Sequence, residues 1–480
     1  MLLSKLCEGF EHVRLGADLN IENLVYDSRR VVKDSLFCCI VGTFSDGHEY
    51  ALNAVNEGAV ALLVEHELPI NVPQVIVGNT RIAMAEMAAA FYDYPERGMR
   101  FVGITGTNGK TTTTYMIKAI AEQAGIKTGL IGTIRNMIGS EVIKTEHTTP
   151  ESVDMYGLLR KMKDAGVELV VMEVSSHSLD QHRVHGIVFD IAEFTNLTQD
   201  HLDYHKTFEN YIAAKKKLFG QSKRGVINID DQYAQTIMRS NEIPYTTFGV
   251  REPADIRASE IDITTRGVQF DLKFPGGRTR INVPIPGLFS VFNAIGAAAV
   301  SLLLGISMEH IKAGLEAMKS VSGRLESLPA GKLGFSVFID YAHTPDAMEN
   351  VLKAIRSFSN GRVITVFGCG GDRDRAKRPI MGETAGRYSD QLVITSDNPR
   401  TENPYDILSA IEEGVKKSGC PYSIIEKRRE AIGFALKLAS ANDTVLIAGK
   451  GHENYQEING IKYPFDDKEA VMEMLEQLQE

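Results

Sequence analysis

The chain has 480 residues, so two to four domains are expected. It has 52 Lys and Arg against 62 Asp and Glu, and its formal net charge of −10 excludes nucleic-acid binding as the main function. Five scattered cysteines without a Cys-x-x-Cys pair are typical of a reducing cytoplasm and not of a disulfide framework. No apolar run reaches the roughly 20 residues that span a bilayer, and the N-terminus lacks a signal-peptide pattern, so we expect a cytoplasmic protein without a membrane span.

Residues 1–98 are predicted to form a first α/β unit. Apolar runs at 35–40, 61–64 and 75–77 are typical of strands, and helices are predicted from residue 51 and over 82–92. The stretch 94–98, YPERG, interrupts this alternation, and we place a domain boundary there. The polar cluster Asp27-Ser28-Arg29-Arg30 is compatible with a simple turn or with a site, since its residue types favour neither.

The second unit begins with residues 100–114, RFVGITGTNGKTTTT. A strand at 101–104, a glycine-rich turn and a helix start follow one another, and such a turn lets backbone N–H groups approach a polyphosphate. Lys110 is placed to reach the outer phosphates, and the Thr111 hydroxyl to hold Mg²⁺. The strict phosphate-loop pattern requires glycine at position 104, where this chain has Ile104, with Gly103 one place early. A tight turn with a chance lysine is the alternative.

Polar side chains follow two predicted strands of this unit. The run 168–174 ends in Glu173, and the run 189–197 is followed by the sequence TQDHLDYH at 198–205. Because ligands bind beyond the carboxyl ends of parallel strands, Glu173 and His201 predict a Mg²⁺ site facing the phosphate turn. A helix from residue 207 carries Lys215, Lys216 and Lys217, which composition alone assigns to a solvated helix face.

The remaining chain adds further strands and helices. Strands are predicted at 224–229 and within 255–274, a hairpin turn at Gly276-Gly277, a helix at 290–304 and an interdomain linker at 321–326. Residues 326–480 alternate again, with strands at 335–340, 362–367, 391–395 and 444–448 and helices at 344–357, 379–389, 405–417, 428–439 and 467–479. Loop arginines at 183, 373 and 400 suit an anionic substrate, which suggests an ATP-driven reaction.

Seven motifs occur in one order: GTNGKTT (106–112), HTTP (147–150), MEVSSH (172–177), DYAHTPD (340–346), GCGGDRD (368–374), DNPR (397–400) and GKGHE (449–453). Together they resemble the Mur ligase family over essentially the whole chain. The resemblance implies an α/β fold of three domains: an N-terminal UDP-substrate-binding domain (1–98), a central P-loop-type ATP-binding domain with a mostly parallel sheet (99–325), and a C-terminal doubly wound, Rossmann-like amino-acid-binding domain (326–480).

The resemblance also implies roles for individual residues. The ATP site would comprise Gly106, Thr107, Asn108, Gly109, Lys110, Thr111, Thr112, Asn293, Arg324 and Asp340. UDP-N-acetylmuramoyl-dipeptide would bind Ser28, Thr148, Thr149, Ser175, Gln181 and Arg183. Diaminopimelate would bind Arg373, Asp397, Asn398, Pro399, Arg400, Gly449 and Glu453. Mg²⁺ would be held by Thr111, Glu173, His201 and Lys215, the last as a carbamate derived from CO₂, and Lys110, Lys215, Glu173 and His201 would be catalytic. This reverses the reading of Lys215 from composition, because a carbamate is an anion. One departure, Lys33-Asp34-Ser35 in place of Pro-Gly-Asp, affects only a local turn.

The implied activity is ATP-dependent ligation in cytoplasmic peptidoglycan precursor synthesis. DNPR resembles the branch that joins meso-2,6-diaminopimelate to the D-Glu of UDP-N-acetylmuramoyl-L-Ala-D-Glu, with small-molecule substrates, domain closure and a monomeric chain expected. Three alternatives stay open: the same ligation with L-Lys, another ligase of the fold such as a folylpolyglutamate synthase, and a nucleotide-dependent binding or switch module. HTTP, DNPR and GKGHE argue against the folylpolyglutamate synthase.

Overall fold

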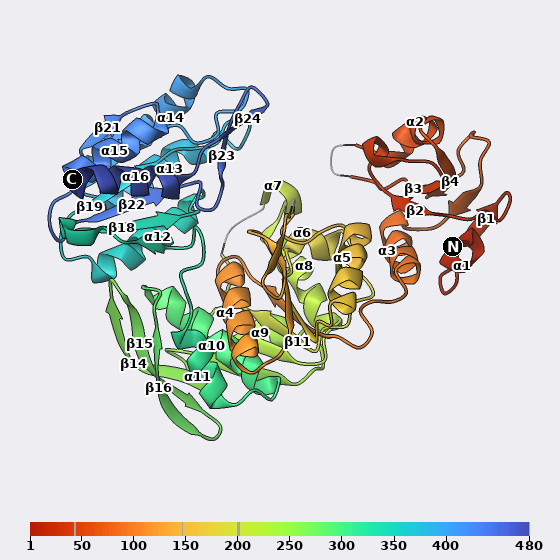
Figure 1. Ribbon diagram of the computed structural model, residues 1–480, viewed down its shortest axis with the longest axis horizontal. Helices are drawn as coiled ribbons and strands as arrows, with labels where there is room; N and C mark the ends of the chain where they lie inside the picture. Colours follow the sequence, from red (N-terminus) through yellow and green to blue (C-terminus); the bar gives the residue numbers. More distant parts are fainter. Residues whose placement is uncertain (43–44, 146, 199–201, 480) are drawn as a thin grey trace.

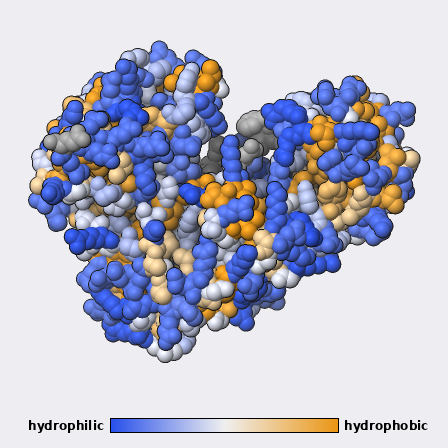
Figure 2. Space-filling view, in the orientation of Figure 1, coloured by the Kyte–Doolittle hydropathy of each residue, from blue (hydrophilic) through white to orange (hydrophobic). Residues whose placement is uncertain are grey.

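The computed structural model describes residues 1–42, 45–145, 147–198 and 202–479. Figure 1 shows three lobes in chain order, each built on its own sheet, with the N-terminal and C-terminal lobes both adjoining the central one. Figure 2 shows the surface hollowed between these two outer lobes. Within the described ranges, none of the helices combines the length and apolarity that a bilayer crossing requires.

The N-terminal sheet has the order β1-β5-β4-β3-β2, and its neighbours are parallel except for β1 and β5. The strands are β1 (Val13–Leu15), β2 (Asn23–Val25), β3 (Ser35–Cys38), β4 (Ala59–Val64) and β5 (Gln74–Ile76). The helices are α1 (Leu3–Leu6), η1 (Ser28–Arg30), η2 (Gly47–Tyr50), α2 (Ala51–Asn56) and α3 (Thr80–Phe91).

The central sheet has the order β16-β15-β14-β13-β12-β11-β6-β10-β7-β8-β9, with parallel pairing from β14 to β7 and antiparallel pairs at both edges. Its strands are β6 (Arg100–Thr105), β7 (Thr128–Ile131), β8 (Asn136–Ile138), β9 (Glu141–Ile143), β10 (Leu169–Glu173), β11 (Ile191–Phe194), β12 (Gly225–Asn228), β13 (Tyr245–Gly249), β14 (Ile256–Thr264), β15 (Gly267–Phe274) and β16 (Gly277–Val283). The helices are α4 (Lys110–Gln123), α5 (Ser152–Asp164), α6 (Ser176–Asp180), α7 (Leu202–His205), α8 (Phe208–Gly220), α9 (Ala234–Met238), α10 (Leu288–Leu303) and α11 (Met308–Glu316).

The C-terminal sheet has the order β17-β18-β22-β19-β20-β21 and is parallel except at β17. Its strands are β17 (Glu326–Leu328), β18 (Ser336–Asp340), β19 (Val363–Phe367), β20 (Gln391–Ile394), β21 (Tyr422–Ile424) and β22 (Thr444–Ala448), and a hairpin of β23 (Tyr455–Ile458) and β24 (Ile461–Pro464) stands apart. The helices are η3 (Gly331–Leu333), α12 (Pro345–Phe358), α13 (Lys377–Tyr388), α14 (Pro404–Ser418), α15 (Arg428–Leu438) and α16 (Asp467–Gln479).

The hydrophobic cores join the lobes unequally. One buried cluster runs from the N-terminal lobe into the central lobe, and it includes Leu63 of β4, Met84 of α3 and Tyr156 of α5. The C-terminal sheet instead has clusters on its two faces that consist of its own buried residues. All five cysteines are free, as their scattered positions predicted, and all five are also buried. The N-terminal lobe is therefore packed onto the central one through a shared apolar core.

The α/β architecture with mostly parallel sheets is confirmed, and most predicted elements lie within two residues of their observed bounds. The hairpin at Gly276-Gly277 is also confirmed, with Phe274 paired to Gly277. The strand predicted over 189–197 is shorter at both ends, and Thr195 and Asn196 beyond its C-terminal end bond through their side chains to the glycine-rich turn. The sequence reading missed several elements, including β7, α5, β13 and the β23–β24 hairpin.

Candidate active site

The glycine-rich turn connects β6 to α4 and holds two glycines that other residues could not replace. Gly106 has φ 152°, and a Cβ there would lie 1.9 Å from the Thr195 Oγ1. Gly109 has φ 89°, and its Cβ would lie 2.5 Å from the Asn293 Oδ1 of α10. Asn293, one of the predicted ATP-binding residues, is thus brought against the turn. Gly103 has a packing role instead, since a Cβ would meet the Phe189 ring at 2.8 Å.

The turn is held in place by the segment that follows β11. Asn196 accepts a hydrogen bond from the Asn108 N–H through its Oδ1 (2.9 Å) and one from the Thr107 N–H through its carbonyl (2.8 Å), while Thr195 Oγ1 donates to the Asn108 carbonyl (2.7 Å). The Lys110 Nζ folds back to donate to the Gly106 and Thr107 carbonyls, both at 2.9 Å. Thr195 and Asn196 were missed as site residues, although only Leu197 separates them from the TQDHLDYH stretch.

Glu173, at the end of β10, is a buried carboxylate at the centre of a hydroxyl network. Its Oε2 accepts hydrogen bonds from Thr111 Oγ1 and Thr133 Oγ1, both at 3.0 Å, and its Oε1 accepts the Thr133 N–H at 2.9 Å. Thr133 Oγ1 also lies 3.1 Å from Thr148 Oγ1. Thr133, which the sequence reading missed, therefore connects a predicted metal ligand to a predicted substrate-binding hydroxyl.

The predicted Mg²⁺ ligands are brought together in part. The Thr111 hydroxyl and the Glu173 carboxylate are hard oxygen donors that suit Mg²⁺. His201 lies outside the described residues, and within the described ones no cluster of three His, Cys, Asp or Glu side chains could hold a metal ion. Lys215 of α8 is 1 % exposed, and its Nζ donates to the Gly106 carbonyl at 2.9 Å. Lys215 and Lys110 thus approach the same carbonyl oxygen.

The predicted substrate-binding residues lie around the ends of β10 and α6. Thr149 Oγ1 donates to the Glu173 carbonyl (2.9 Å) and to Ser175 Oγ (3.4 Å). Arg183 donates to the Thr149 carbonyl (3.0 Å) and to Gln181 Oε1 (2.7 Å). Ser28 lies apart from this group, at the start of η1 in the N-terminal lobe.

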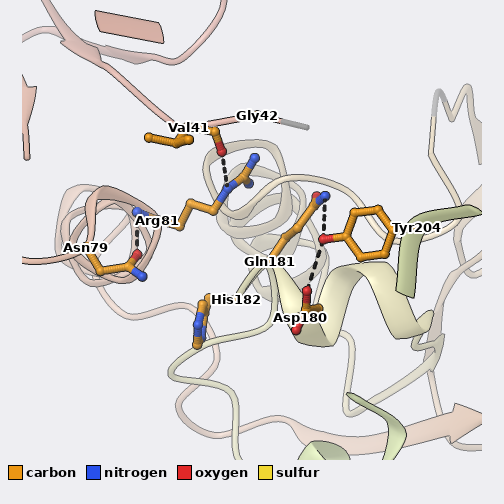
Figure 3. A pocket seen from close by; sticks show the side chains of 8 residues that line it. All are labelled: Val41, Gly42, Asn79, Arg81, Asp180, Gln181, His182 and Tyr204. Atoms are coloured by element: carbon orange, nitrogen blue, oxygen red, sulfur yellow. Dashed lines mark hydrogen bonds between the residues drawn. The ribbon is translucent and has the colours of Figure 1, made fainter. Parts of the chain in front are cut away.

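A cavity of about 260 Å³ opens next to these residues, between the N-terminal and central lobes. Figure 3 shows Arg81 of α3 on one side and Gln181 and Tyr204 on the other, with the Gln181 Nε2 donating to the Tyr204 hydroxyl at 3.2 Å. Its lining is Val41, Gly42, Asn79, Arg81, Asp180, Gln181, His182 and Tyr204.

The junction with the C-terminal lobe carries positive charge. The Arg324 Nη2 donates to Thr111 Oγ1 at 3.4 Å, and its guanidinium stacks 5.1 Å from the Tyr341 ring. The carboxylate of Asp340, a predicted ATP-site residue, accepts hydrogen bonds from the Leu325 and Ala342 N–H groups at 2.7 and 2.8 Å. Burial, together with the charge of Arg324, lowers the pKa of His452 to about 4, so this imidazole is neutral at pH 7. Such a junction suits phosphate groups.

The DNPR and GKGHE motifs meet in the C-terminal lobe. The Asn398 Nδ2 donates to Glu453 Oε2 at 2.8 Å, and a Cβ at Gly449 would lie 2.7 Å from Asp397 Oδ2. The buried Lys450, missed by the sequence reading, donates to Asn398 Oδ1 (3.2 Å) and Glu453 Oε2 (3.1 Å).

Arg400 lies between a glycine turn and the β23–β24 hairpin. Its Nη1 donates to the Gly371 carbonyl at 2.7 Å, and its Nε lies 3.3 Å from Glu457 Oε2 of β23. A Cβ at Gly370 would lie 2.9 Å from the Arg400 Nη1 and 3.7 Å from the Arg373 Cγ, so both predicted arginines flank this turn. Cationic and anionic side chains therefore stand side by side around residues 397–400.

Comparison with known proteins matches all three lobes. Residues 20–92 match the model "Mur ligase family, catalytic domain", residues 104–301 the "Mur ligase middle domain" and residues 323–451 the "Mur ligase, glutamate ligase domain". UDP-N-acetylmuramoyl-L-alanyl-D-glutamate–2,6-diaminopimelate ligase 1 of Clostridium acetobutylicum is 49 % identical over 484 residues, covering 100 % of both chains. The corresponding ligase of Caldanaerobacter subterraneus subsp. tengcongensis is 47 % identical, covering 99 % of both chains.

A solved structure of a UDP-N-acetylmuramoyl-L-alanyl-D-glutamate–2,6-diaminopimelate ligase is also similar. It superposes with a TM-score of 0.69 at 33 % identity and covers 96 % of both chains. Family models spanning all three lobes and curated relatives of matching length agree with the motif order. The chain belongs to the Mur ligase family.

Proposed function

We propose that this chain joins meso-2,6-diaminopimelate to the D-Glu carboxylate of UDP-N-acetylmuramoyl-L-Ala-D-Glu, using ATP. The observation that carries the proposal is the mixed-charge group around residues 397–400, where Arg400 and Glu453 are brought to one loop. The free end of diaminopimelate bears both a carboxylate and an ammonium group. An arginine beside carboxylates complements such an end, whereas the ammonium end of L-Lys offers Arg400 no partner. The relatives from Clostridium acetobutylicum and Caldanaerobacter subterraneus are named for these substrates, which supports the same choice here.

The reaction would proceed in two steps. The terminal phosphoryl group of ATP passes to the D-Glu carboxylate, which gives an acyl phosphate and ADP. The amine of diaminopimelate then attacks the acyl carbon, a tetrahedral intermediate forms, and its collapse releases phosphate and leaves an amide once the nitrogen has lost its proton. Lys110 and the N–H groups of the turn would stabilise charge on the phosphoryl oxygens.

Mg²⁺ would be held by the Thr111 hydroxyl and the Glu173 carboxylate, with His201 as a further ligand, and it would neutralise phosphate charge. The remaining predicted ATP contacts, which include Asn293 and Arg324, belong to the same proposal. The domain boundaries at 98/99 and 325/326 and a monomeric chain are also part of this proposal.

Lys215 is proposed to react with CO₂, forming an N–C bond and releasing a proton, so that it becomes a carbamate. Burial supports this choice among the three lysines, because Lys215 is 1 % exposed, whereas the side chain of Lys217 is 43 % exposed and pairs with Asp180. An anion at position 215 would also offset the nearby Lys110 charge. We expect Lys215→Ala to lose turnover and Lys217→Ala to retain it. The opposite order would place the carbamate elsewhere.

The function is tested by phosphate release with UDP-N-acetylmuramoyl-L-Ala-D-Glu, ATP and a panel of amino acids. We expect release to depend on meso-diaminopimelate, and Arg400→Ala to raise its KM by about 10- to 100-fold, the range for a lost charge-assisted contact, with the KM of ATP unchanged. Arg387→Ala is the control, since Arg387 is exposed and pairs with Glu383 within α13. Preference for L-Lys, or release without any amino acid, would contradict the proposal.

A further inference from the structure

One buried carboxylate is shared by two arginines at the junction of the N-terminal and central lobes. Glu151, which precedes α5, lies 3.0 Å from the Arg81 Nη1 through its Oε2 and 3.0 Å from the Arg183 Nε through its Oε1. The three side chains are largely removed from solvent, with exposed fractions of 13 % for Arg81, 7 % for Glu151 and 15 % for Arg183. Arg81 comes from α3 of the N-terminal lobe, whereas Arg183 follows α6 of the central lobe.

Both arginines are connected to the cavity shown in Figure 3. Arg81 lines it directly and donates from its Nε to the Val41 carbonyl at 3.3 Å. Arg183 holds Gln181 Oε1 at 2.7 Å, and Gln181 lines the opposite side of the cavity. The orientation of both cavity-lining groups thus depends on one carboxylate.

The charges at this junction do not cancel. Two guanidinium groups face one carboxylate, and the Asp180 carboxylate in the cavity lining is already paired with Lys217, which leaves an excess of positive charge next to a polar cavity. An anionic ligand suits such a site, because buried charges interact strongly and require compensation. The UDP-linked dipeptide of the proposed function, on which this inference rests, carries a diphosphate and carboxylates.

We propose that Glu151 is a positioning residue for the UDP-linked substrate. It fixes the Arg183 guanidinium in its binding orientation and joins it to Arg81, so that substrate affinity depends on the docking of α3 against α5. Arg81 takes part as well, because it links α3 of the N-terminal lobe to the carboxylate that orients Arg183.

The same junction offers a matched control. Asp154 lies three residues after Glu151 in α5 and also binds the N-terminal lobe, through the Tyr26 hydroxyl and through Arg30 at 3.3 Å. The contacts of Asp154 do not include Arg183 or the cavity lining. A variant at Asp154 therefore weakens the attachment of the N-terminal lobe without disturbing the arginine in the substrate site.

The experiment compares Glu151→Gln, Arg81→Gln and Asp154→Asn in the full-length chain, with KM measured separately for each of the three substrates. We expect Glu151→Gln to raise the KM of the UDP-linked dipeptide by about tenfold or more, because a buried arginine loses its charged partner. Arg81→Gln should raise the same KM less than Glu151→Gln does, and so should Asp154→Asn, whose partner Arg30 lies in η1 with the predicted substrate-binding residue Ser28. The KM values of ATP and diaminopimelate should stay constant in all three variants.

Calorimetric titration of the UDP-linked dipeptide, in the absence of ATP, keeps the test independent of turnover, and circular dichroism identifies a variant that does not fold. Equal losses in Glu151→Gln and Asp154→Asn would show that lobe attachment alone matters, and an unchanged KM in Glu151→Gln would overturn the inference. An unchanged KM in Arg81→Gln would remove the coupling to the N-terminal lobe. Absence of diaminopimelate-dependent turnover in the unmodified chain would instead contradict the proposed function.

Discussion

Glu193 brings a carboxyl group into the interior of the central sheet. Its side chain is fully buried on β11, and within the described residues neither of its oxygens has a hydrogen-bond partner. A Cβ at Gly296 of α10 would lie 2.2 Å from Glu193 Oε1, so the helix makes room for the carboxyl group at that position. Burial raises the pKa of this group to about 8, and it is therefore mostly protonated at neutral pH.

This carboxyl group makes stability depend on pH in a defined direction. Between its ordinary pKa of 4.5 and the folded value of about 8, the folded chain binds more protons than the unfolded chain. The free energy of unfolding therefore falls as pH rises through this window. We expect Glu193→Gln to be more stable than the unmodified chain by a margin that grows from about pH 5 to pH 8, up to on the order of 3 kcal/mol.

Thermal melts at several pH values measure this margin. Glu413→Gln, at an exposed position of α14, is the control and should shift the melting temperature little at any pH. A margin for Glu193→Gln that is the same at pH 5 and pH 8 would show that the buried group does not titrate in this window.

Sequence motifs predict side chains that stand in contiguous signatures, but not the partners that the fold brings to them. Glu173, Asn398 and Glu453 lie in motifs. In the structure Glu173 bonds to Thr111 of another motif, and Asn398 bonds to Glu453. Thr133 lies outside the motifs and bonds to Glu173, 40 positions along the chain. Lys450 lies inside GKGHE, but its partner Asn398 is 52 positions away, and no local pattern gives that pairing. Glu151 had the best available signal, since it directly follows the HTTP motif.

Helices α13 and α14 pack closely against each other through two glycines. A Cβ at Gly414 of α14 would lie 1.8 Å from the Pro379 carbonyl, and one at Gly382 of α13 would lie 2.2 Å from the Ile411 carbonyl. The loops before these two helices carry the Gly370-Gly371 turn and Arg400. The separation of α13 and α14 therefore sets the distance between two parts of the predicted amino-acid site.

We expect Gly414→Ala to force the two helices apart and to destabilise the chain by about 1–3 kcal/mol, the usual cost of overpacking. The KM of diaminopimelate should rise with it, while that of ATP stays constant. Gly433→Ala in α15 is the control, because its Cβ would meet only the flexible Met474 side chain within 3.0 Å. Melting temperature and substrate KM values check both variants, and equal behaviour would exclude the close packing as the cause.

The β23–β24 hairpin shows why some elements escape prediction. Its strands are short and partly exposed, with no alternation of apolar residues. The Asn459-Gly460 pair, with φ of 49° and 77°, is nevertheless a characteristic two-residue hairpin turn, and this signal was available in the sequence. The hairpin is fixed through its bonds to the DNPR loop, as in the Arg400 N–H to Glu457 carbonyl contact at 3.0 Å.

The junction between the N-terminal and central lobes differs in kind from the junction between the central and C-terminal lobes. The N-terminal lobe shares an extended apolar core with the central lobe. Among the described residues, the central and C-terminal lobes are connected by polar contacts across the glycine-rich turn and by only two partly buried apolar side chains, Ile263 and Phe289, that pack against the C-terminal core. Asp346 of α12 accepts hydrogen bonds from the Asn108 Nδ2 (3.2 Å) and from Thr198 Oγ1 (2.9 Å). The three-lobe plan could be predicted from alternation and motif order, whereas these junctions depend on tertiary packing.

Because polar contacts exchange with water at little cost, the C-terminal lobe is the one expected to move. We expect Asp346→Ala to increase the radius of gyration without ligands, and ATP with both co-substrates to reduce it in the unmodified chain. Small-angle X-ray scattering measures both changes. Asp406→Ala, at an exposed position of α14, should leave the radius unchanged. Equal radii for all three proteins would argue against a polar hinge at this junction.

The five buried cysteines bear on how the enzyme would withstand oxidants. Burial raises the pKa of Cys7 and Cys420 to about 11 and that of Cys39 and Cys369 to about 12, and Cys38 shifts in the same direction. Thiolates, the forms that peroxides and alkylating agents attack, are therefore scarce in the folded chain. The thiols of the folded chain should therefore react with peroxides and alkylating agents more slowly than exposed thiols do.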